Sequence, residues 1–295
     1  TGLKRSTTVE SLSAICQRLG ATLMAAGRWA AAGRVYSAIL SRVPDDLGSC
    51  LNLFDAYLLA TNKNAAAALL ADSPAKYRDN PRFRFVVARK YLQAEYYSEA
   101  LDLFADIEKK MEASKGKDEF RDSVYHFGYG MAGERCGRIE FAEKHFERCI
   151  EMDAGNHNAM NYLAYMWAER GANLDKALEY IRKALDIEPA NAAYLDTLGW
   201  IYYRQNKPDQ ALEQVKKAIG IAPDEPVVME HLGDIYMAMS QPDKAVESWK
   251  KSFVLDPESK SVAKKLQDRG ANLAQLRKEA EENRKKSEVG GQKSE

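Results

Sequence analysis

The sequence lacks several features that would assign it to particular classes of protein. It has no apolar run of about 18 residues or more, so no membrane-spanning helix and no direct membrane insertion are predicted. Its 43 basic residues match its 43 acidic ones, which argues against a nucleic acid as the main partner. Its four cysteines form no CxxC motif, which favours free thiols over a metal or redox centre.

Signatures of catalysis are also missing. The sequence contains no HExxH, no glycine-rich phosphate loop and no GxSxG. His145 and Cys149 lie four residues apart on one predicted helix, as a pair of metal ligands can, but no third ligand is near them in the sequence. We therefore expect a protein that is not an enzyme, with no catalytic residue, no cofactor and no metal.

The start of the chain carries no initiating Met and no visible signal peptide. It reads TGLKRSTT, which fits a processed or trimmed product. Charged residues make up 29% of the chain and apolar residues 45%, a balance that suits a soluble, helix-rich protein.

What the sequence does have is an internal repeat. Gly199 and Ala211 recur 34 residues later as Gly233 and Ala245, and similar pairs recur upstream. The register divides the chain into seven repeats: 13–46, 47–80, 81–114, 123–156, 157–191, 192–225 and 226–259. The third repeat is followed by an eight-residue insertion, and the fifth carries one extra residue. The twentieth position of every repeat is alanine: Ala32, Ala66, Ala100, Ala142, Ala177, Ala211 and Ala245.

The pattern predicts two helices, A and B, in each repeat. In the sixth repeat Leu195, Leu198 and Tyr202 stand at positions 4, 7 and 11, which is the spacing of one helix face. A small residue at position 8 and the alanine at position 20 allow helices A and B to cross at about 8 Å. Because one hairpin cannot bury its own apolar face, at least about three must stack. We therefore predict an all-α solenoid.

The motifs LDTLGWIYY…A…V…A…P and MEHLGDIYM…A…W…S…P resemble those of the tetratricopeptide repeat family, over residues 13–259. The stretch from Asn161 to Arg204 is similar to bacterial multi-repeat members. The resemblance implies a right-handed α-α superhelix of about seven hairpins within residues 1–259. Such bacterial proteins are often scaffolds in envelope or assembly complexes. The compartment stays open between the bacterial cytoplasm and the periplasm or envelope.

Two segments depart from the regular pattern. In the second repeat Phe54 replaces the small residue and Pro74 falls inside the expected helix B, which should be short or broken there. After the last repeat, residues 260–288 are expected to form a capping helix that is polar on its outer face. Residues 289–295 are expected to be disordered.

The resemblance also implies that the A helices line a concave groove, with positions 2, 5, 6, 9, 12 and 13 pointing into it. These positions are basic and aromatic in the third repeat, aromatic with amides in the middle repeats and acidic in the last one. Large aromatics and arginine carry much of the binding energy at interfaces. The predicted groove residues for a peptide or protein are Arg82, Phe85, Arg89, Phe127, Met131, Asn158, Asn161, Tyr162, Tyr165, Trp200, Tyr203, Arg204, Glu230 and Asp234.

Two of these residues have an open role at this stage. Trp200 and Tyr203 either contact a ligand or pack against helix A of the next repeat as large core residues. A clamp for a C-terminal carboxylate, found in some members of the family, is not supported, because only Asn52 and Arg82 fit its five positions.

The predicted function is a non-enzymatic scaffold or adaptor that binds a protein or peptide segment in its groove. One alternative is a structural subunit that self-associates or spaces the components of an envelope or assembly complex. Another is an accessory subunit of an envelope enzyme. The sequence leaves the oligomeric state and the identity of the partner open.

Overall fold

The computed structural model describes the backbone of residues 2–114 and 121–291 and the side chains of residues 12–112 and 121–286. The described backbone forms helices and no strand. These helices are α1 (Gly2–Ala25), α2 (Trp29–Leu40), α3 (Leu47–Leu59), α4 (Lys63–Asp72), α5 (Ala75–Arg78), α6 (Pro81–Gln93), α7 (Tyr97–Ser114), α8 (Ser123–Arg135), α9 (Ile139–Met152), α10 (His157–Arg170), α11 (Leu174–Ile187), α12 (Ala192–Arg204), α13 (Pro208–Ile221), α14 (Pro226–Ala238), α15 (Pro242–Leu255), α16 (Lys260–Gln267) and α17 (Leu273–Gly291).

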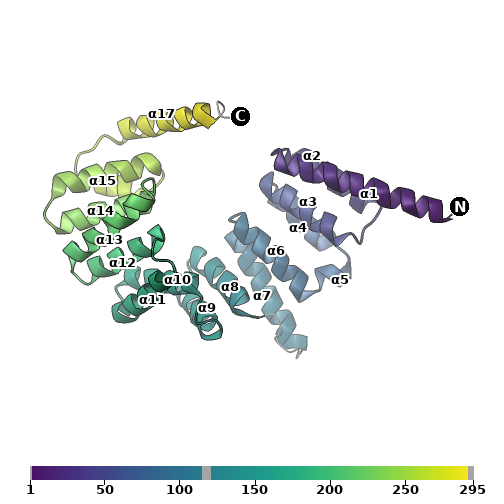
Figure 1. Cartoon of the computed structure of the whole chain (residues 1–295), viewed down its shortest axis with the longest axis horizontal. Coiled ribbons are helices and arrows are strands. Elements are labelled where there is room, and N and C mark those ends of the chain that lie inside the picture. Colours follow the sequence, from purple (N-terminus) through teal and green to yellow (C-terminus); the bar gives the residue numbers. More distant parts are fainter. Residues whose placement is uncertain (1, 115–120, 292–295) are drawn as a thin grey trace. The chain divides into compact units, whose positions relative to one another are not determined.

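The chain forms two compact bodies, Thr1–Arg148 and Cys149–Glu295. We call them the N-terminal body and the C-terminal body. In each body helices pair into antiparallel hairpins, for example α6 with α7 and α12 with α13 (Figure 1). Within each body, neighbouring hairpins pack against one another, as α2 does on α3 and α13 on α14. The predicted all-α class of stacked hairpins is confirmed.

Short polar side chains start most of the A helices. An Asp or Asn precedes α3, α6, α8, α10 and α12, and its side chain accepts a backbone N–H of the first turn. Such caps satisfy donors that have no partner within the helix. Each of these capping residues directly precedes the first residue of its repeat. The five A helices therefore start at the same position of the repeat.

The small residues of the repeat lie where helices A and B cross. All seven alanines at position 20 have an exposed fraction of 0%. A Cβ added to Gly199 would lie 2.6 Å from Val215 Cγ2, and one added to Gly233 would lie 2.3 Å from Trp249 Nε1. The backbones therefore approach as closely as the sequence pattern requires, and larger residues at these positions would force them apart.

The second repeat has an interrupted helix B. Helix α4 ends at Asp72, Ser73 is extended, and the four-residue helix α5 follows Pro74. The break fits the inability of proline to continue a helix.

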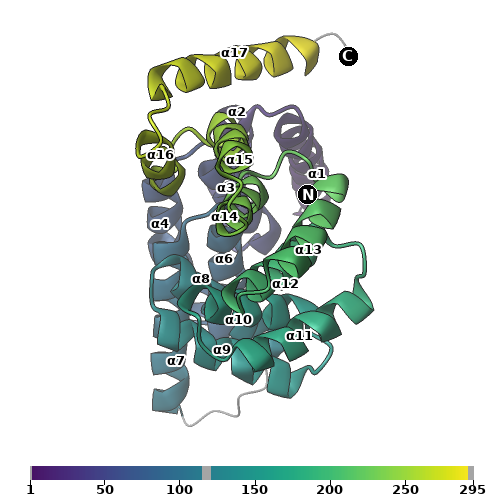
Figure 2. The ribbon, with the colours of Figure 1, turned by 90° about the vertical axis from the view of Figure 1, so that its left-hand side faces the viewer.

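The segment after the last repeat differs from the single capping helix that was expected. It holds two helices, α16 and α17, and Gly270 between them adopts a φ of +72°, which favours glycine. Both helices follow the α14–α15 hairpin (Figure 2). Residues 289–291, which were expected to be disordered, belong to α17. Residues 292–295 lie outside the described residues.

Candidate functional site

Three A helices of the C-terminal body, α10, α12 and α14, carry most of the predicted groove residues. Helix α10 packs against α12, and α12 packs against α14. Side chains at positions 5, 6 and 9 of these three A helices therefore lie close to one another. Tyr165 of α10 has its ring centroid 6.3 Å from that of His231 in α14, which in turn lies against Asp196 and Trp200 of α12.

Trp200 is a core residue of this face. Its exposed fraction is 7%, and its ring stacks on His231 with centroids 4.0 Å apart and planes inclined by 14°. Tyr203 stacks on the same indole at 4.6 Å and stays half-buried. Of the two roles left open, Trp200 therefore has the second: it packs against helix A of the next repeat. It is not an exposed contact.

Under this stack lies an ion pair that the sequence analysis did not single out. His231 Nδ1 lies 2.9 Å from Asp196 Oδ2, and both residues are at most 5% exposed. Burial on its own would lower the pKa of His231, but the nearby carboxylates, Asp196 foremost with Glu169 and Asp234, together raise it above the usual value. The pair joins position 5 of one repeat to position 6 of the next, a relation that a single helix pattern does not reveal.

The acidic end of the predicted groove is neutralised from outside the repeats. Lys265 of α16 lies 2.7 Å from both Glu230 Oε1 and Asp234 Oδ2, and Ser261 Oγ donates to Glu230 at 2.6 Å. Burial alone would raise the pKa of Glu230, but hydrogen bonds from Lys265 and Ser261 lower it overall. Asp234 also accepts a hydrogen bond from Trp249 Nε1 at 3.0 Å. Glu230 and Asp234 thus hold α16 in place.

Arg204 is engaged in a helix cap. Its Nη1 donates to the carbonyl oxygen of Glu169 near the end of α10 at 2.6 Å, where a cation satisfies free carbonyl groups. Gly171 ends that helix with a φ of +64°, and a Cβ there would lie 2.8 Å from Arg204 Nη2. Asn158 is also engaged, since its Oδ1 accepts from Tyr194 Oη at 2.9 Å.

A pocket of about 290 Å³ opens beside this face, between α10, α12 and the start of α14. Asn161 and Tyr165 line it from α10, and Asp196 and Thr197 line it from α12. Glu225 joins them from the link before α14. Asn161 Oδ1 is buried with no hydrogen-bond partner among the described residues. An unpaired buried acceptor costs free energy, which a donor from a ligand would recover.

The predicted groove residues of the N-terminal body form a separate group. Phe85 is half-buried, with its ring centroid 5.6 Å from that of Tyr125, and Arg89 lies over it at 5.9 Å. Arg82 is exposed at the first turn of the same helix, α6. From α8, Phe127 packs on Phe146 at 5.9 Å, and Met131 is half-buried. Tyr162, in the C-terminal body, is half-buried as well.

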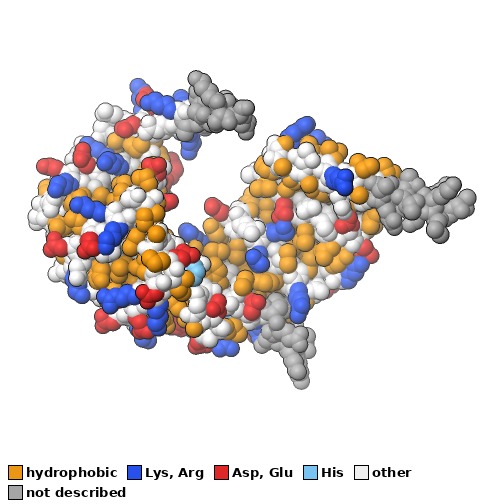
Figure 3. Space-filling model, in the orientation of Figure 1, with side chains coloured by type: hydrophobic (Ala, Val, Ile, Leu, Met, Phe, Trp, Pro, Cys, Tyr) orange, Lys and Arg blue, Asp and Glu red, His pale blue; other side chains and the backbone are white. Residues whose placement is uncertain are grey.

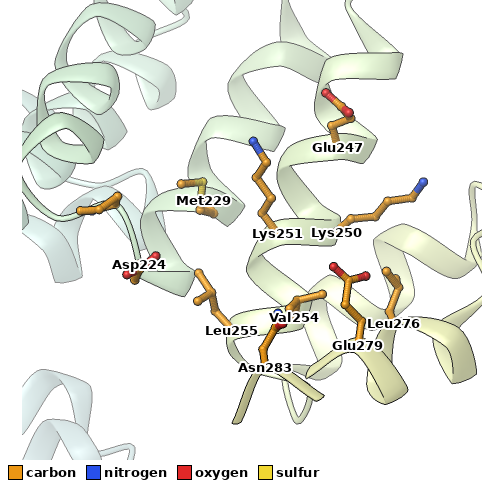
Figure 4. A pocket seen from close by; sticks show the side chains of 11 residues that line it. Asp224, Met229, Glu247, Lys250, Lys251, Val254, Leu255, Leu276, Glu279 and Asn283 are labelled. Carbon is orange, nitrogen blue, oxygen red and sulfur yellow. The ribbon is translucent and has the colours of Figure 1, made fainter. Parts of the chain in front are cut away.

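A second pocket of the C-terminal body, of about 390 Å³, lies between α15, α17 and the link before α14 (Figure 4). Its apolar lining includes Met229, Val254, Leu255 and Leu276. In Figure 4, Leu276 and Glu279 of α17 face Val254 of α15. Lysine and glutamate side chains both line this pocket, and none of its described polar side-chain atoms is buried without a partner. Its chemistry therefore selects no ligand by charge.

The histidines of the N-terminal body lie close together. His126 Nδ1 lies 3.0 Å from His145 Nδ1, and burial lowers the pKa of His145 to about 4. Among the described residues no group of three His, Cys, Asp or Glu side chains is placed to hold a metal ion. The helices described here include none long and apolar enough to cross a membrane.

Comparison with protein families agrees with the repeat pattern. One tetratricopeptide repeat model matches residues 23–90 and 170–228, and a second matches residues 135–192. Together the matches cover more than half of the chain. The chain belongs to the tetratricopeptide repeat family. Proteins of this family generally mediate protein–protein interactions and are generally not enzymes.

Two relatives share short stretches with the chain. The TPR repeat-containing protein PA4667 of Pseudomonas aeruginosa is 36% identical over 77 residues, which are 26% of this chain and 13% of that protein. The protein CTR9 homolog of Arabidopsis thaliana is 31% identical over 74 residues, which are 25% of this chain and 7% of that protein. The chain thus matches only a small part of either relative.

Solved structures share the fold over most of the chain. A tetratricopeptide repeat protein from Parabacteroides merdae has a TM-score of 0.66 at 14% identity, covering 86% of this chain and 97% of its own. A chain of the APC/C hetero-tetramer Cut9–Hcn1 has a TM-score of 0.61 at 14% identity, covering 84% of this chain and 47% of its own. At such identities the likeness shows the fold alone.

Proposed function

We propose that this protein is a non-enzymatic adaptor that binds an extended segment of a partner protein along α10 and α12. The Asn161 pocket takes a basic side chain of that segment. The observation that carries this proposal is the buried, unpartnered Oδ1 of Asn161 in a pocket that also holds two carboxylates. The general role of the family in protein–protein interactions supports it.

The chemistry of the pocket favours a cation. Asn161 Oδ1 accepts a hydrogen bond, and the Glu225 carboxylate adds negative charge, whereas the charge of Asp196 is balanced by His231. No lysine or arginine is among the residues that line the pocket. The Tyr165 ring offers an aromatic wall, which attracts ammonium and guanidinium groups. An acidic side chain would meet the Glu225 carboxylate and no lysine or arginine here, so it is disfavoured.

The predicted residues around the pocket divide by role. Asn161, Tyr162 and Tyr165 on α10 act as contacts, together with the half-buried surface of Tyr203 on α12. Trp200 acts indirectly, because its stack on His231 fixes the spacing of α12 and α14. Arg204, Glu230 and Asp234 position helices through the contacts described above.

A peptide selection tests the proposal. A random peptide library is selected against the full chain, and enriched peptides are resynthesised with Lys, Gln or Glu at their shared basic position. We expect selected peptides to carry Lys or Arg there, and Gln to weaken binding by about tenfold or more in a fluorescence polarisation titration. Asn161→Leu should weaken the Lys peptide by a similar factor.

The matched control is Asn52→Leu, an exposed asparagine on α3 of the N-terminal body. It should leave the affinity unchanged. Selected peptides without a shared basic residue, or equal affinity for the wild type and Asn161→Leu, would contradict the assignment of the pocket.

A further inference from the structure

Helix α6 of the N-terminal body carries charge of one sign. Its sequence, PRFRFVVARKYLQ, holds four basic residues and no acidic one. Two of the four pair with carboxylates on neighbouring helices. Arg84 Nη1 lies 2.9 Å from Asp106 Oδ2 of α7. Lys90 Nζ lies 2.6 Å from Asp55 Oδ2 of α3. These two pairs balance half of the charge on the helix.

Arg89 stands apart from these pairs. It is exposed at position 9 of its repeat and forms no ion pair with another described side chain. The A helices that contact α6 are α3 and α8, and each has one acidic residue. On α3 this residue is Asp55, the partner of Lys90. On α8 it is Glu134, whose Oε2 lies 3.4 Å from Arg135 Nε. The charge of Arg89 is therefore not balanced by the described part of the body.

The position of Arg89 is restrained by an aromatic side chain. Its guanidinium carbon lies 5.9 Å from the centroid of the Phe85 ring, within the range of a cation–π contact. The Phe85 ring packs in turn on Phe104 and Tyr125, with centroids 6.0 Å and 5.6 Å away. Both of these rings are 0% exposed. Because the guanidinium rests on a fixed ring, it loses less conformational freedom when it pairs with an anion.

An apolar surface lies beside the guanidinium. Val86, at position 6, is 39% exposed. Arg89 follows Phe85 by four residues and Val86 by three, so the three side chains share one face of α6. Phe85 is half-buried, which leaves part of its ring open. We call Phe85, Val86 and Arg89 the α6 patch. The patch combines one cation with an apolar surface.

We propose that the α6 patch is a docking surface for an acidic segment of a partner protein. A carboxylate side chain of that segment pairs with Arg89, and an apolar side chain beside it packs on Val86 and the open part of the Phe85 ring. Arginine can offer two parallel N–H donors to one carboxylate. Because an exposed ion pair alone contributes little, the apolar contact is needed to exclude water from it.

A short protein segment fits the patch better than a polyanion does. Nucleic acids and anionic membranes are held by fields of many cations. The chain has equal numbers of basic and acidic residues. Over the face shown in Figure 3, Lys and Arg side chains are interspersed with Asp and Glu side chains. One guanidinium next to an apolar surface matches a single carboxylate next to an apolar side chain. The group expected is a side-chain carboxylate, because the sequence does not support a clamp for a C-terminal one.

A peptide selection with blocked C-termini tests the proposal. A synthetic random library of C-terminally amidated peptides is selected against the full chain. We expect a class that shares a Glu or Asp next to an apolar residue. Replacing that acid by its amide should weaken binding by about tenfold in a fluorescence polarisation titration. Arg89→Gln should weaken the acidic peptide by a similar factor and leave the amide peptide unchanged. The matched control is Arg34→Gln, an exposed arginine on α2 of the same body, which should have no effect.

A charge swap gives a second measurement that a general loss of structure cannot imitate. Arg89→Glu should weaken the acidic peptide further, and a peptide with Lys in place of the acid should regain affinity for this variant. Asn161→Leu should leave the acidic peptides unaffected, which separates this proposal from that of the Asn161 pocket. A selection without an acidic class overturns the proposal. So do acidic peptides that bind wild type and Arg89→Gln equally well.

Discussion

The two edges of the repeat array meet the solvent in different ways. At the N-terminal edge, Ile15 and Leu19 stand at positions 3 and 7 with exposed fractions of 61% and 50%. At the C-terminal edge, α16 begins where helix A of an eighth repeat would begin. Val262 and Leu266, at positions 3 and 7 of that helix, are both 0% exposed.

The difference shows that a short helix can cover the last hairpin of a solenoid. It needs two aliphatic residues spaced to face that hairpin and one cation that pairs with its carboxylates. Helix α16 has only eight residues. Lys265 ties it to Glu230 and Asp234 on α14, and α17 covers part of α15. The N-terminal edge has a helix of 24 residues and no such cover among the described side chains. Length alone therefore does not make a cap.

The largest expected effect comes from breaking the covered edge. Leu266→Asp should destabilise the protein by about 3–5 kcal/mol, because it removes a buried aliphatic side chain and leaves a charge without a partner. Ile15→Asp at the open edge should change the stability by less than about 0.5 kcal/mol, because Ile15 is 61% exposed. Urea unfolding of both variants measures the two effects. Equal losses would mean that the two edges are alike.

The tie between α16 and α14 is expected to have the next largest effect. Lys265→Met should cost about 1–3 kcal/mol at neutral pH, because two partly buried carboxylates lose their cation. The pKa of Glu230 is lowered in the folded state, so this stabilisation is present above the unfolded pKa and is lost as the pH falls through the folded one. The difference between wild type and variant should therefore shrink in acid. Arg42→Met, at the exposed edge, is the control.

Two glycines test whether the edges differ in backbone strain. Gly27, before α2, and Gly270, before α17, have φ values of +69° and +72°. A Cβ would meet only Trp29 Cζ2 at 3.7 Å in the first case and nothing within 4 Å in the second. Alanine at either site should therefore cost about the same, roughly 1–2 kcal/mol of conformational strain. Thermal unfolding of both variants checks this, and a clear inequality would mean that the edges also differ in their turns.

The smallest expected effect is a pH dependence that arises where α14 packs against α12. The pKa of His231 on α14 is raised, so the contribution of its pair with Asp196 is complete below the unfolded pKa and is lost as the pH rises through the folded one. His231→Gln should reduce this loss, by about 1 kcal/mol at most. Melting temperatures of wild type and variant between about pH 6 and pH 9 measure it. An identical pH profile for both would exclude the pair as its source.

The fold could be predicted from the sequence because helices A and B must cross closely in every repeat. The alanine at position 20 must be small in all seven repeats, so it forms a column that one sequence reveals. The break at Gly270 was missed because an isolated glycine in a helical pattern does not show whether the chain will adopt a positive φ there. Pro74 was informative, since a proline in the interior of a helix removes a hydrogen bond and clashes with the preceding turn whatever surrounds the helix.

The candidate site was harder to predict from the sequence, because its side chains contact residues of other repeats. Helical spacing placed Trp200 at a groove position, but its burial depends on His231, 31 residues further on. Glu230 and Asp234 read as an acidic end because their cation, Lys265, lies outside the repeats. Asn161, a predicted groove residue, lines a pocket in the structure, and the proposed division between contact and positioning residues required the structure.

The closed edge also gives the molecule a mechanical polarity. In a solenoid each hairpin is held mainly by its neighbours. The α14–α15 hairpin packs against neighbours on both sides, α13 and α16, whereas among the described elements the α1–α2 hairpin packs only against α3. When this stretch of chain is pulled by its two ends, the α1–α2 hairpin should therefore unfold before the α14–α15 hairpin.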